Sequence, residues 1–513
     1  MRTIIRDPLL AAKTTYDCIV VGAGIYGISL ALQASRMGLS CLLLEKNDFG
    51  GATTFNHLRT VHGGLRYLQS LDLRRFFESV GERSWFLREF PGLATPLPCL
   101  MPLYGNGPYR PSIFRGALAL NDLLSWNRNR EVAPGQELPA GRVVDAATVF
   151  RLFPQIDRQG LQGGAIWHDG GMASPQLLVM EMLKRACAAG ATALNYLEAQ
   201  ELLTEEGQVR GIRGMDHEHG QRIEFLGNVV INAAGPCCRA FAAGFDQDRP
   251  ELFRASIAWN VLFNRTALAA HSLAIRPKRP NSRMYFVHGF NGLLMGGTIH
   301  APWNGGSDPM PTPEEVGAFI DDLNLTVPGL ALQPADVLQI YPGLLPAREE
   351  GSARLAVREI IHNHGATGGP QGVYSVSGVK FTTARLVAEK TLRMIFPERR
   401  PVAQPDQVWD TGTSDGHFPF AWLPQAADTN WPERLRGIIH REAVCHLDDL
   451  LLRRTSLGDN PLRAAAIALD IARLFDWEAP RRTEEVLRLL DFFRKRTIMP
   501  ELFSVEALDR PLP

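Results

Sequence analysis

The residues with the clearest chemical potential are three glycines and one glutamate near the N-terminus. A short apolar run leads into the spacing Gly22-x-Gly24-x-x-Gly27, and a second apolar run, Cys41–Leu44, ends at Glu45. Gly22 permits a tight turn, Gly24 lets the backbone approach a pyrophosphate, and Gly27 lets a helix pack closely on its strand. Amides at the helix start stabilise the pyrophosphate, and Glu45 accepts hydrogen bonds from a ribose. The spacing therefore predicts a strand–turn–helix–strand unit that binds a dinucleotide.

A segment rich in glycine and small hydroxyl residues follows Glu45. It contains the runs 48–54, DFGGATT, and 61–68, VHGGLRYL. Many small donors directly after the dinucleotide motif favour FAD over NAD, although composition and spacing alone leave both dinucleotides open.

Length and composition describe a globular protein with more than one domain. The chain has 513 residues, of which 45% are hydrophobic, whereas a single core stops growing near roughly 250 to 300 residues. Lys plus Arg and Asp plus Glu number 54 each, so no overall field favours nucleic acid or an acidic membrane surface. We therefore expect no nucleic-acid partner.

The cysteines and the apolar runs predict the compartment. Seven cysteines are scattered without a C-x-x-C pair, which fits a reducing environment. The N-terminus lacks the continuous apolar core of a signal peptide, and no run approaches the roughly 20 apolar residues that cross a bilayer. We therefore expect a cytoplasmic protein whose membrane contact is at most peripheral, on the inner face of the cell membrane.

Motifs spread along the chain carry a resemblance to a known family. The two runs after Glu45 resemble the flavin-binding region of the aerobic-type, FAD-dependent glycerol-3-phosphate dehydrogenases, within the D-amino-acid-oxidase-like superfamily. The family is also similar at residues 232–236 (NAAGP), 296–298 (GGT), 341–343 (YPG) and 377–385 (SGVKFTTAR). Together the matches extend over residues 15–400.

The resemblance implies an α/β fold with a Rossmann-type, glutathione-reductase-like FAD-binding domain assembled from separated segments. We expect this domain at residues 1–100, 150–245 and 350–400, an inserted α+β substrate-binding domain at 101–149 and 246–349, and a helical C-terminal domain at 401–513. Apolar residues at helical spacing predict the C-terminal helices, and Pro401, Pro405 and the DTGTSDG run indicate a linker before them.

The resemblance also implies which residues contact FAD. The threonines of the run 48–54 lie near the FAD phosphates, and the glycines of the run 61–68 approach the isoalloxazine. A predicted helix, Lys380–Lys390, directs its N-terminus at the flavin pyrimidine edge and stabilises negative charge there. The predicted cofactor contacts are Gly22, Gly24, Gly27, Glu45, Lys46, Thr53, Thr54, Gly63, Gly64, Ala234, Gly235, Gly378, Lys380, Phe381 and Thr382.

Four residues at motif-matched positions are expected to bind the substrate: Arg66, Tyr67, Arg358 and Lys380. In the family, such a basic cluster holds a three-carbon phosphate with its C2 hydrogen facing flavin N5. Arginine forks bind phosphate or carboxylate in a bidentate way, so the resemblance implies an anionic substrate. His62 is expected near the flavin, in a packing, hydrogen-bonding or proton-transfer role.

Two positions depart from the family pattern. Residues 342–347, PGLLPA, stand where the family reads S-G-x-R-P-L, so Leu345 replaces an active-site arginine. Arg348 either restores this charge or belongs to a solvated turn. Asn260 stands approximately where relatives have a histidine, and asparagine cannot act as a general base at neutral pH. His300 is either a replacement base or a polar residue of a loop.

Two histidine pairs have a spacing that metal ligands use, His217-x-His219 and His362-x-His364. Both lie in polar, glycine-containing stretches without companion cysteines or spaced carboxylates. We therefore expect surface loops at both pairs and no metal site.

Three functions remain open. The first is a dehydrogenase of glycerol 3-phosphate or a related anionic secondary alcohol, which passes hydride to FAD N5 and then electrons to a membrane quinone, dioxygen or a soluble carrier. The second is an oxidase of an amine or a 2-hydroxy acid, which Leu345 and Asn260 favour. The third is a catalytically lapsed FAD-binding protein.

Overall fold

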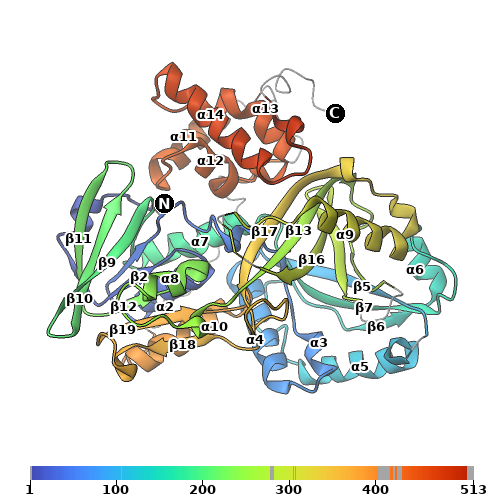
Figure 1. Ribbon diagram of the computed structural model, residues 1–513. Helices are drawn as coiled ribbons and strands as arrows, with labels where there is room; N and C mark the ends of the chain where they lie inside the picture. The colour runs from blue at the N-terminus through green and yellow to red at the C-terminus, as the bar shows by residue number, and fades with distance from the viewer. Residues whose placement is uncertain are drawn as a thin grey trace.

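The computed structural model describes residues 3–105, 107–277, 282–303, 305–306, 308–401, 416–419, 422–424 and 430–504. Two parts that contain sheets lie side by side, and the C-terminal helices, drawn in orange-red to red, lie above them (Figure 1). The chain crosses between the two lower parts several times, so each of them is assembled from separated segments.

A six-stranded sheet forms the centre of the part on the left of Figure 1. Its order is β18-β19-β12-β2-β3-β8, and all neighbours are parallel except β18 and β19. The strands are β2 (Cys18–Val21), β3 (Cys41–Leu44), β8 (Thr192–Leu194), β12 (Val230–Asn232), β18 (Ile360–Asn363) and β19 (Val373–Ser377). Strands β2 and β3 are buried throughout, as expected for unbroken apolar runs in a parallel sheet with both faces covered.

Helices pack on this sheet, and α2 contacts both α7 and α10. The helices of this part are α1 (Pro8–Ala11), α2 (Ile25–Arg36), α7 (Pro175–Ala188), α8 (Cys238–Ala242) and α10 (Ala384–Ile395). The predicted strand–turn–helix–strand unit is thus confirmed as β2, α2 and β3.

Helix α10 begins at Ala384, four residues after the predicted start at Lys380. The Tyr26 hydroxyl accepts a hydrogen bond from the Lys380 amide at 3.1 Å and donates one to the Lys380 carbonyl oxygen at 2.8 Å. These bonds hold Lys380 outside the helix, in a turn that leads into it.

A small sheet of order β1-β11-β10-β9 adjoins the six-stranded sheet. Its strands are β1 (Thr15–Tyr16), β9 (Leu197–Glu205), β10 (Gln208–Asp216) and β11 (Gln221–Gly227). In β11, buried and exposed residues alternate, as expected for a strand with one face in the core and one in solvent.

The second part holds a nine-stranded sheet of order β17-β13-β16-β15-β14-β5-β7-β4, with β6 paired to β7. Its strands are β4 (Thr60–Val61), β5 (Thr95–Leu103), β6 (Arg142–Val144), β7 (Gly163–Gly171), β13 (Ala255–Thr266), β14 (Ser272–Ile275), β15 (Tyr285–Phe290), β16 (Leu293–Pro302) and β17 (Val337–Pro346). Its helices are α3 (Leu65–Leu68), α4 (Leu73–Glu89), α5 (Pro111–Leu124), α6 (Ala146–Leu152) and α9 (Pro313–Thr326).

Strand β7 departs from the predicted domain boundaries, because residues 150–245 were expected in the FAD-binding domain. It pairs with β5 in the nine-stranded sheet. The two strands are far apart in the sequence, and the glycine-rich run of β7 gives no alternating apolar signal that would reveal its partner. Strand β4 and helices α3 and α4, which lie within residues 1–100, also belong to this second part, and the remaining boundaries stay a prediction.

Among the described residues, four α-helices lie beyond the two sheets and confirm the predicted helical C-terminal region. They are α11 (Trp431–Arg441), α12 (Leu447–Asp449), α13 (Pro461–Ala472) and α14 (Ala479–Arg494), and a π-helical turn, Leu450–Arg454, follows α12. The predicted linker residues Pro405 and 410–415 lie outside the described residues. No helix within the described part of the chain has the length and apolar character to cross a bilayer.

Buried ion pairs join these helices to the dinucleotide unit. Asp48, which follows β3, accepts hydrogen bonds from Arg454 Nη1 at 2.6 Å and Nη2 at 2.7 Å, and it also pairs with Arg453. Burial alone would raise the pKa of Asp48, but the charges of Arg454 and Arg453 outweigh burial and hold this pKa well below its usual range. The carboxylate is therefore ionised although it is buried.

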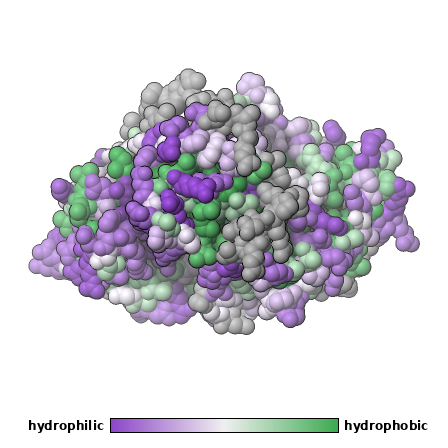
Figure 2. All heavy atoms as spheres, turned by 90° about the horizontal axis from the view of Figure 1, so that it is seen from above, coloured by the Kyte–Doolittle hydropathy of each residue, from purple (hydrophilic) through white to green (hydrophobic). Residues whose placement is uncertain are grey.

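The face that carries the C-terminal helices is predominantly hydrophilic. Figure 2 shows hydrophobic residues there in separate areas among hydrophilic ones. The apolar side chains of the C-terminal helices instead form their own core, with Leu435, Leu451 and Leu489 fully buried. Their helical apolar stripes are accordingly packing surfaces.

Candidate functional site

Steric constraints at the β2–α2 turn match those of a dinucleotide site. Gly22 has a φ of +97°, and a Cβ atom there would lie 2.7 Å from Ala234 Cα. A Cβ atom at Gly27 would lie 1.8 Å from the Gly22 carbonyl oxygen. Gly24 is the N-cap of α2, so the first amides of that helix point out of the turn. The backbone of this turn therefore tolerates no side chain at Gly22 or Gly27.

Glu45 and Thr54 organise the same turn. Glu45 accepts hydrogen bonds from the amides of Ala23 at 2.8 Å and Asn47 at 3.0 Å, and burial raises the pKa of its carboxyl group. Thr54 Oγ1 accepts from the Ile25 amide at 2.9 Å. Both predicted contact residues thus lie at the start of α2.

Other predicted cofactor residues lie around this turn. Lys46 reaches Cys237 at the end of the short 3-10 helix Gly235–Cys237, with Nζ 3.5 Å from Sγ. Gly235 has a φ of +55°, and the Asn232 side chain accepts a hydrogen bond from the Ala234 amide at 3.3 Å. The Asn232–Gly235 segment therefore follows β12 directly into the neighbourhood of Gly22.

Thr53 connects the dinucleotide unit to the second sheet. Its hydroxyl donates a hydrogen bond to the Leu344 carbonyl oxygen at 3.1 Å, and a Cβ atom at Gly343 would lie 3.0 Å from its methyl group. Leu345, the replaced arginine position, follows in β17 and is half-buried. Arg348 lies beyond this strand with 63% of its side chain exposed and an ion pair to Glu349, which favours the solvated turn.

The cofactor residues of the last motif lie between α2 and α4. A Cβ atom at Gly378 would lie 1.9 Å from Tyr26 Cζ. The Phe381 ring lies 4.5 Å from the His57 ring and 5.9 Å from the Phe86 ring, measured between centroids, and Thr382 is buried. Packing against three rings fixes this segment at the start of α10.

A histidine–carboxylate pair lies at the start of the 61–68 run. His62 Nδ1 is 3.1 Å from Asp169 Oδ2, and the Gly63 amide donates to Asp169 Oδ1 at 2.8 Å. Burial alone would raise the pKa of Asp169, but the hydrogen bonds and the Arg83 charge outweigh it and lower this pKa. Asp169 is therefore a carboxylate that orients His62 through Nδ1 and leaves Nε2 free to accept a proton. His62 is solvent-accessible, with 46% of its side chain exposed.

Sequence reasoning missed Asp169 and Arg83. Arg83 lies under Gly63, where an added Cβ atom would meet its Nη1 at 1.9 Å, and it donates to the His168 carbonyl oxygen at 2.8 Å. Gly64, with a φ of +84°, packs over Ser79 of the same helix. The only sequence signal was an aspartate inside the run 167–171, WHDGG, at the end of β7.

His300 lies in strand β16, so the predicted loop is wrong. Burial, followed by the charges of Arg283 and Arg66, lowers the pKa of His300 to about 4, and its Nδ1 atom has no hydrogen-bond partner. Its imidazole is neutral at pH 7 and is a weak base. Arg66 is exposed and lies close enough to His300 to influence its titration.

Asn260 is a packing residue in β13 with 2% exposure. It donates to the Asn56 carbonyl oxygen at 2.9 Å and accepts from the Thr298 hydroxyl at 2.8 Å. Its amide therefore bonds both β16 and the segment after Thr53. The side chain thus joins the two parts of the molecule and cannot take over a base role.

Tyr67 and Lys380 are brought together, as expected. Lys380 Nζ bonds the Tyr67 hydroxyl and lies 4.3 Å from the centroid of its ring, and the Arg75 guanidinium lies 5.2 Å from the same centroid. Lys380 and Arg358 line one cavity. Three of the four predicted substrate residues therefore form one connected group, and Arg66 lies beside it in α3.

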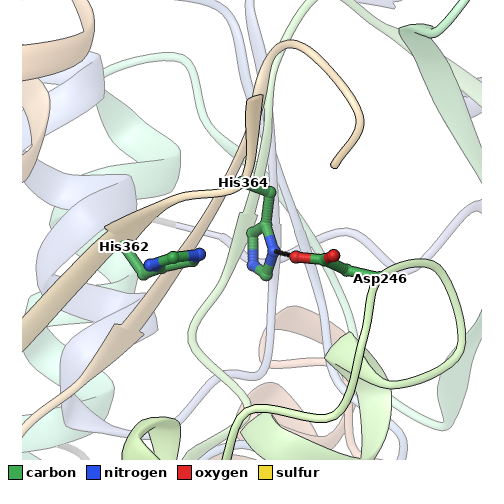
Figure 3. A group of neighbouring side chains, drawn as sticks. All are labelled: Asp246, His362 and His364. Atoms are coloured by element: carbon green, nitrogen blue, oxygen red, sulfur yellow. Dashed lines mark hydrogen bonds and ion pairs between the residues drawn. The ribbon is translucent and has the colours of Figure 1, made fainter. Parts of the chain in front are cut away.

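The histidine pairs differ from each other. His217 and His219 are exposed after β10, as expected. His364 is fully buried and His362 lies in β18, so a surface loop is wrong for the second pair. Figure 3 shows both side chains with Asp246, the one group of three metal-ligating residues in the part of the chain that the structure describes.

The Asp246 group is a closed polar network. His364 Nδ1 lies 2.6 Å from Asp246 Oδ2, and His364 Nε2 lies 2.8 Å from the buried Ser375 hydroxyl. Arg249 Nε donates to the same Asp246 oxygen at 3.0 Å. Both nitrogens of His364 form hydrogen bonds, and the Arg249 guanidinium already pairs with the Asp246 carboxylate. These residues therefore fit a structural role better than a role as cation ligands.

The glycine turn, the Glu45 carboxylate and the small residues of the run 48–54 together fit FAD. The cradle is formed by positions that a Cβ atom would fill, Gly22 and Gly27, and by the N-terminus of a 12-residue helix, where a pyrophosphate is stabilised.

Comparisons with known proteins support this reading. A family model described as FAD dependent oxidoreductase matches residues 17–393. Glycerol-3-phosphate dehydrogenase 1 of Mycobacterium tuberculosis H37Rv is 31% identical over 395 residues, which cover 75% of this chain and 73% of that protein. Glycerol-3-phosphate dehydrogenase of Synechocystis is 29% identical over 413 residues, which cover 77% and 72%.

A solved structure shares the fold over almost the whole chain. The glycerol-3-phosphate dehydrogenase from Bacillus halodurans, complexed with FAD, is similar with a TM-score of 0.69 and 19% identity over 95% of this chain and 96% of that chain. At this identity the likeness shows the fold, including the helices beyond residue 400.

Proposed function

Because the chain belongs to the FAD-dependent glycerol-3-phosphate dehydrogenases, within the FAD dependent oxidoreductases, we propose that it oxidises glycerol 3-phosphate or a related anionic secondary alcohol. FAD is the cofactor. One observation supports the substrate assignment most strongly. The short run 62–67 supplies a histidine paired with a buried carboxylate and a tyrosine bonded to Lys380, so a proton acceptor and a cation lie on neighbouring turns.

His62 is the proposed proton acceptor. Asp169 holds Nδ1, so Nε2 takes the proton of the substrate hydroxyl, and the nearby carboxylate stabilises the imidazolium that forms. Bound FAD supplies the acceptor for the hydride that leaves the alcohol carbon. The low pKa of His300, about 4, makes it the weaker alternative.

The basic residues orient the substrate. Arg358 and Lys380 face one cavity, and Arg66 stands one residue before Tyr67. Guanidinium groups bind phosphate oxygens in a bidentate way, which fixes the carbon chain as well as the charge. We therefore assign Arg66, Tyr67, Arg358 and Lys380 to substrate binding.

We further propose a membrane quinone as the electron acceptor, with the protein docked on the inner face of the membrane. Helix α5 supports this proposal. Its exposed side includes Ile113, Leu120 and Leu123, and Trp126 follows with 80% of its surface exposed. A helix with an apolar exposed face and a terminal tryptophan is typical of interfacial membrane contacts. Seven free cysteines fit the reducing compartment on that side.

A second candidate is an oxidase of an amine or 2-hydroxy acid. Leu345 favours it, because a half-buried leucine in β17 removes a guanidinium that the family uses for a phosphate. A carboxylate with one negative charge would need fewer cationic partners.

Anaerobic mixing of the purified holoenzyme with single substrates tests the proposal. Glycerol 3-phosphate is expected to bleach the flavin absorbance rapidly, whereas glycerol, lactate and glycine leave it unchanged. Bleaching by lactate or glycine alone, followed by rapid reoxidation of the flavin when dioxygen is admitted, would establish the oxidase class. A flavin that no substrate reduces would indicate the lapsed binding protein.

A further inference from the structure

A basic cavity lies between α2, α4 and the start of α10. It opens to solvent, and its volume is about 30 Å³. Its lining residues include Tyr26, Arg74, Arg75, Glu78, Arg358 and Lys380. Three separated segments contribute cations to this one space: residues 74–75 of α4, the strand entry before β18 and the turn before α10.

The acidic side chains at the cavity are already neutralised. Lys390 Nζ lies 3.1 Å from Glu78 and 2.8 Å from Glu359, and Arg74 Nε donates to Glu78 at 3.3 Å. Arg74 and both glutamates therefore form a closed group with Lys390. The positive charge that remains belongs to Arg75, Arg358 and Lys380.

The three remaining cations have few anionic partners. Arg358 forms no ion pair or hydrogen bond within the described ranges of the chain. Lys380 Nζ bonds only the neutral Tyr67 hydroxyl among those residues. Arg75 forms an ion pair with Asp72, with Nε 3.1 Å from Oδ2, but among the described residues its guanidinium donates no hydrogen bond.

Arg75 and Lys380 both contact the ring of Tyr67. Both cations lie against the ring of Tyr67, at 5.2 Å and 4.3 Å from its centroid. Cation–π attraction to one ring offsets only part of the repulsion between two like charges. An anion in the cavity would remove that repulsion.

The N-terminus of α10 adds to the positive potential. Val379 and Thr383, which precede this 12-residue helix, line the cavity, and no side chain caps the first turn. Free amides and the positive end of a helix dipole stabilise an anion there.

We propose that Arg75 is a substrate-binding residue that, with Arg358 and Lys380, binds the phosphate dianion of the substrate in this cavity. The inference rests on the proposed function and deepens it. Leu345 removes one cation from β17, and Arg75 supplies one from α4. Three cations on one cavity match a phosphate monoester, with two negative charges, better than a carboxylate with one.

Calorimetric titration of the oxidised holoenzyme with inorganic phosphate tests this site without turnover. Arg75→Gln is expected to weaken phosphate binding by roughly 10- to 100-fold, the loss of one charge-assisted hydrogen-bonded pair. The matched control Arg74→Gln removes a neighbouring arginine that is already paired with Glu78, and it is expected to change binding by less than about 3-fold.

Two further readouts separate the outcomes. Arg75→Lys is expected to restore part of the affinity, and Arg75→Gln is expected to raise KM for glycerol 3-phosphate far more than it lowers kcat, with flavin content unchanged. Equal losses for Arg74→Gln and Arg75→Gln, or full phosphate affinity in Arg75→Gln, would overturn the assignment. If phosphate binding depends on Arg75 but glycerol 3-phosphate never bleaches the flavin, the proposed reaction fails and the anion site stands.

Discussion

The dinucleotide turn and the basic cavity contrast in how each is built. The turn uses backbone geometry, because backbone atoms of Ala234 and of Gly22 itself leave no room for a Cβ atom at Gly22 or Gly27. The cavity instead uses cationic side chains from three segments that are distant in the sequence. A fixed cofactor cradle beside an adjustable anion site allows one fold to change its substrate while keeping FAD.

The largest expected effect is at the rigid region. Gly27→Val places carbon atoms at the Gly22 carbonyl, where a Cβ alone would lie 1.8 Å away, so we expect purified protein without FAD. Flavin absorbance per protein measures this loss. Gly81→Ala, in α4 with open space around it, is the matched control and should retain FAD fully. A yellow Gly27→Val protein would show that the turn is not the cofactor cradle.

The next effect lies at the boundary between the two regions. His62→Gln removes the proposed proton acceptor and is expected to lower kcat by about 10²- to 10⁴-fold, the usual contribution of a general base. FAD content should stay the same, because the substitution removes only a side-chain contact with Asp169. The Gly63 amide keeps its own hydrogen bond to Asp169. Stopped-flow flavin reduction measures the change, and an unaltered rate would assign the proton to another group.

Removal of a buried charge should lower stability rather than activity. Asp48→Asn leaves Arg453 and Arg454 buried without their shared carboxylate, so the free energy of unfolding should fall by about 3 to 5 kcal/mol. Denaturant titration measures it. Asp248→Asn, which breaks an exposed pair with Arg239, should cost less than about 1 kcal/mol. An equal loss of unfolding free energy in the two variants would contradict a stabilising role for the buried ion pairs of Asp48.

The smallest effect concerns pH. Burial alone would lower the pKa of His446, but hydrogen bonds to Glu218 and Glu485 outweigh it and raise this pKa to about 9. The contribution of the imidazolium to stability is therefore fully present below about pH 6.5 and is lost as the pH rises through 9. We expect wild type to lose on the order of 1 to 2 kcal/mol across this window relative to His446→Gln. If the free energies of unfolding of the two proteins changed with pH in parallel, the ion pairs of His446 with Glu218 and Glu485 would be rejected as the cause.

The same contrast explains what the sequence could predict. The run from β2 to β3 was predicted correctly because its glycines and apolar residues act on neighbours a few positions away. The start of α10 was predicted at Lys380, four residues too early. The Tyr26 hydroxyl, which holds Lys380 outside the helix, comes from α2, far away in the sequence. Asp169 and Arg75 escaped prediction, since their roles depend on which strands and helices meet in space. His364 was misplaced at the surface for the same reason.

The central claim is that this chain removes hydrogen from C2 of glycerol 3-phosphate. The most direct test is anaerobic stopped-flow measurement of flavin reduction with glycerol 3-phosphate that carries protium or deuterium at C2. The proposed function predicts rapid reduction that is clearly slower with the deuterated substrate, because the C2–H bond breaks in that step. Reduction at the same rate with both substrates, or no reduction while FAD stays bound, would contradict it.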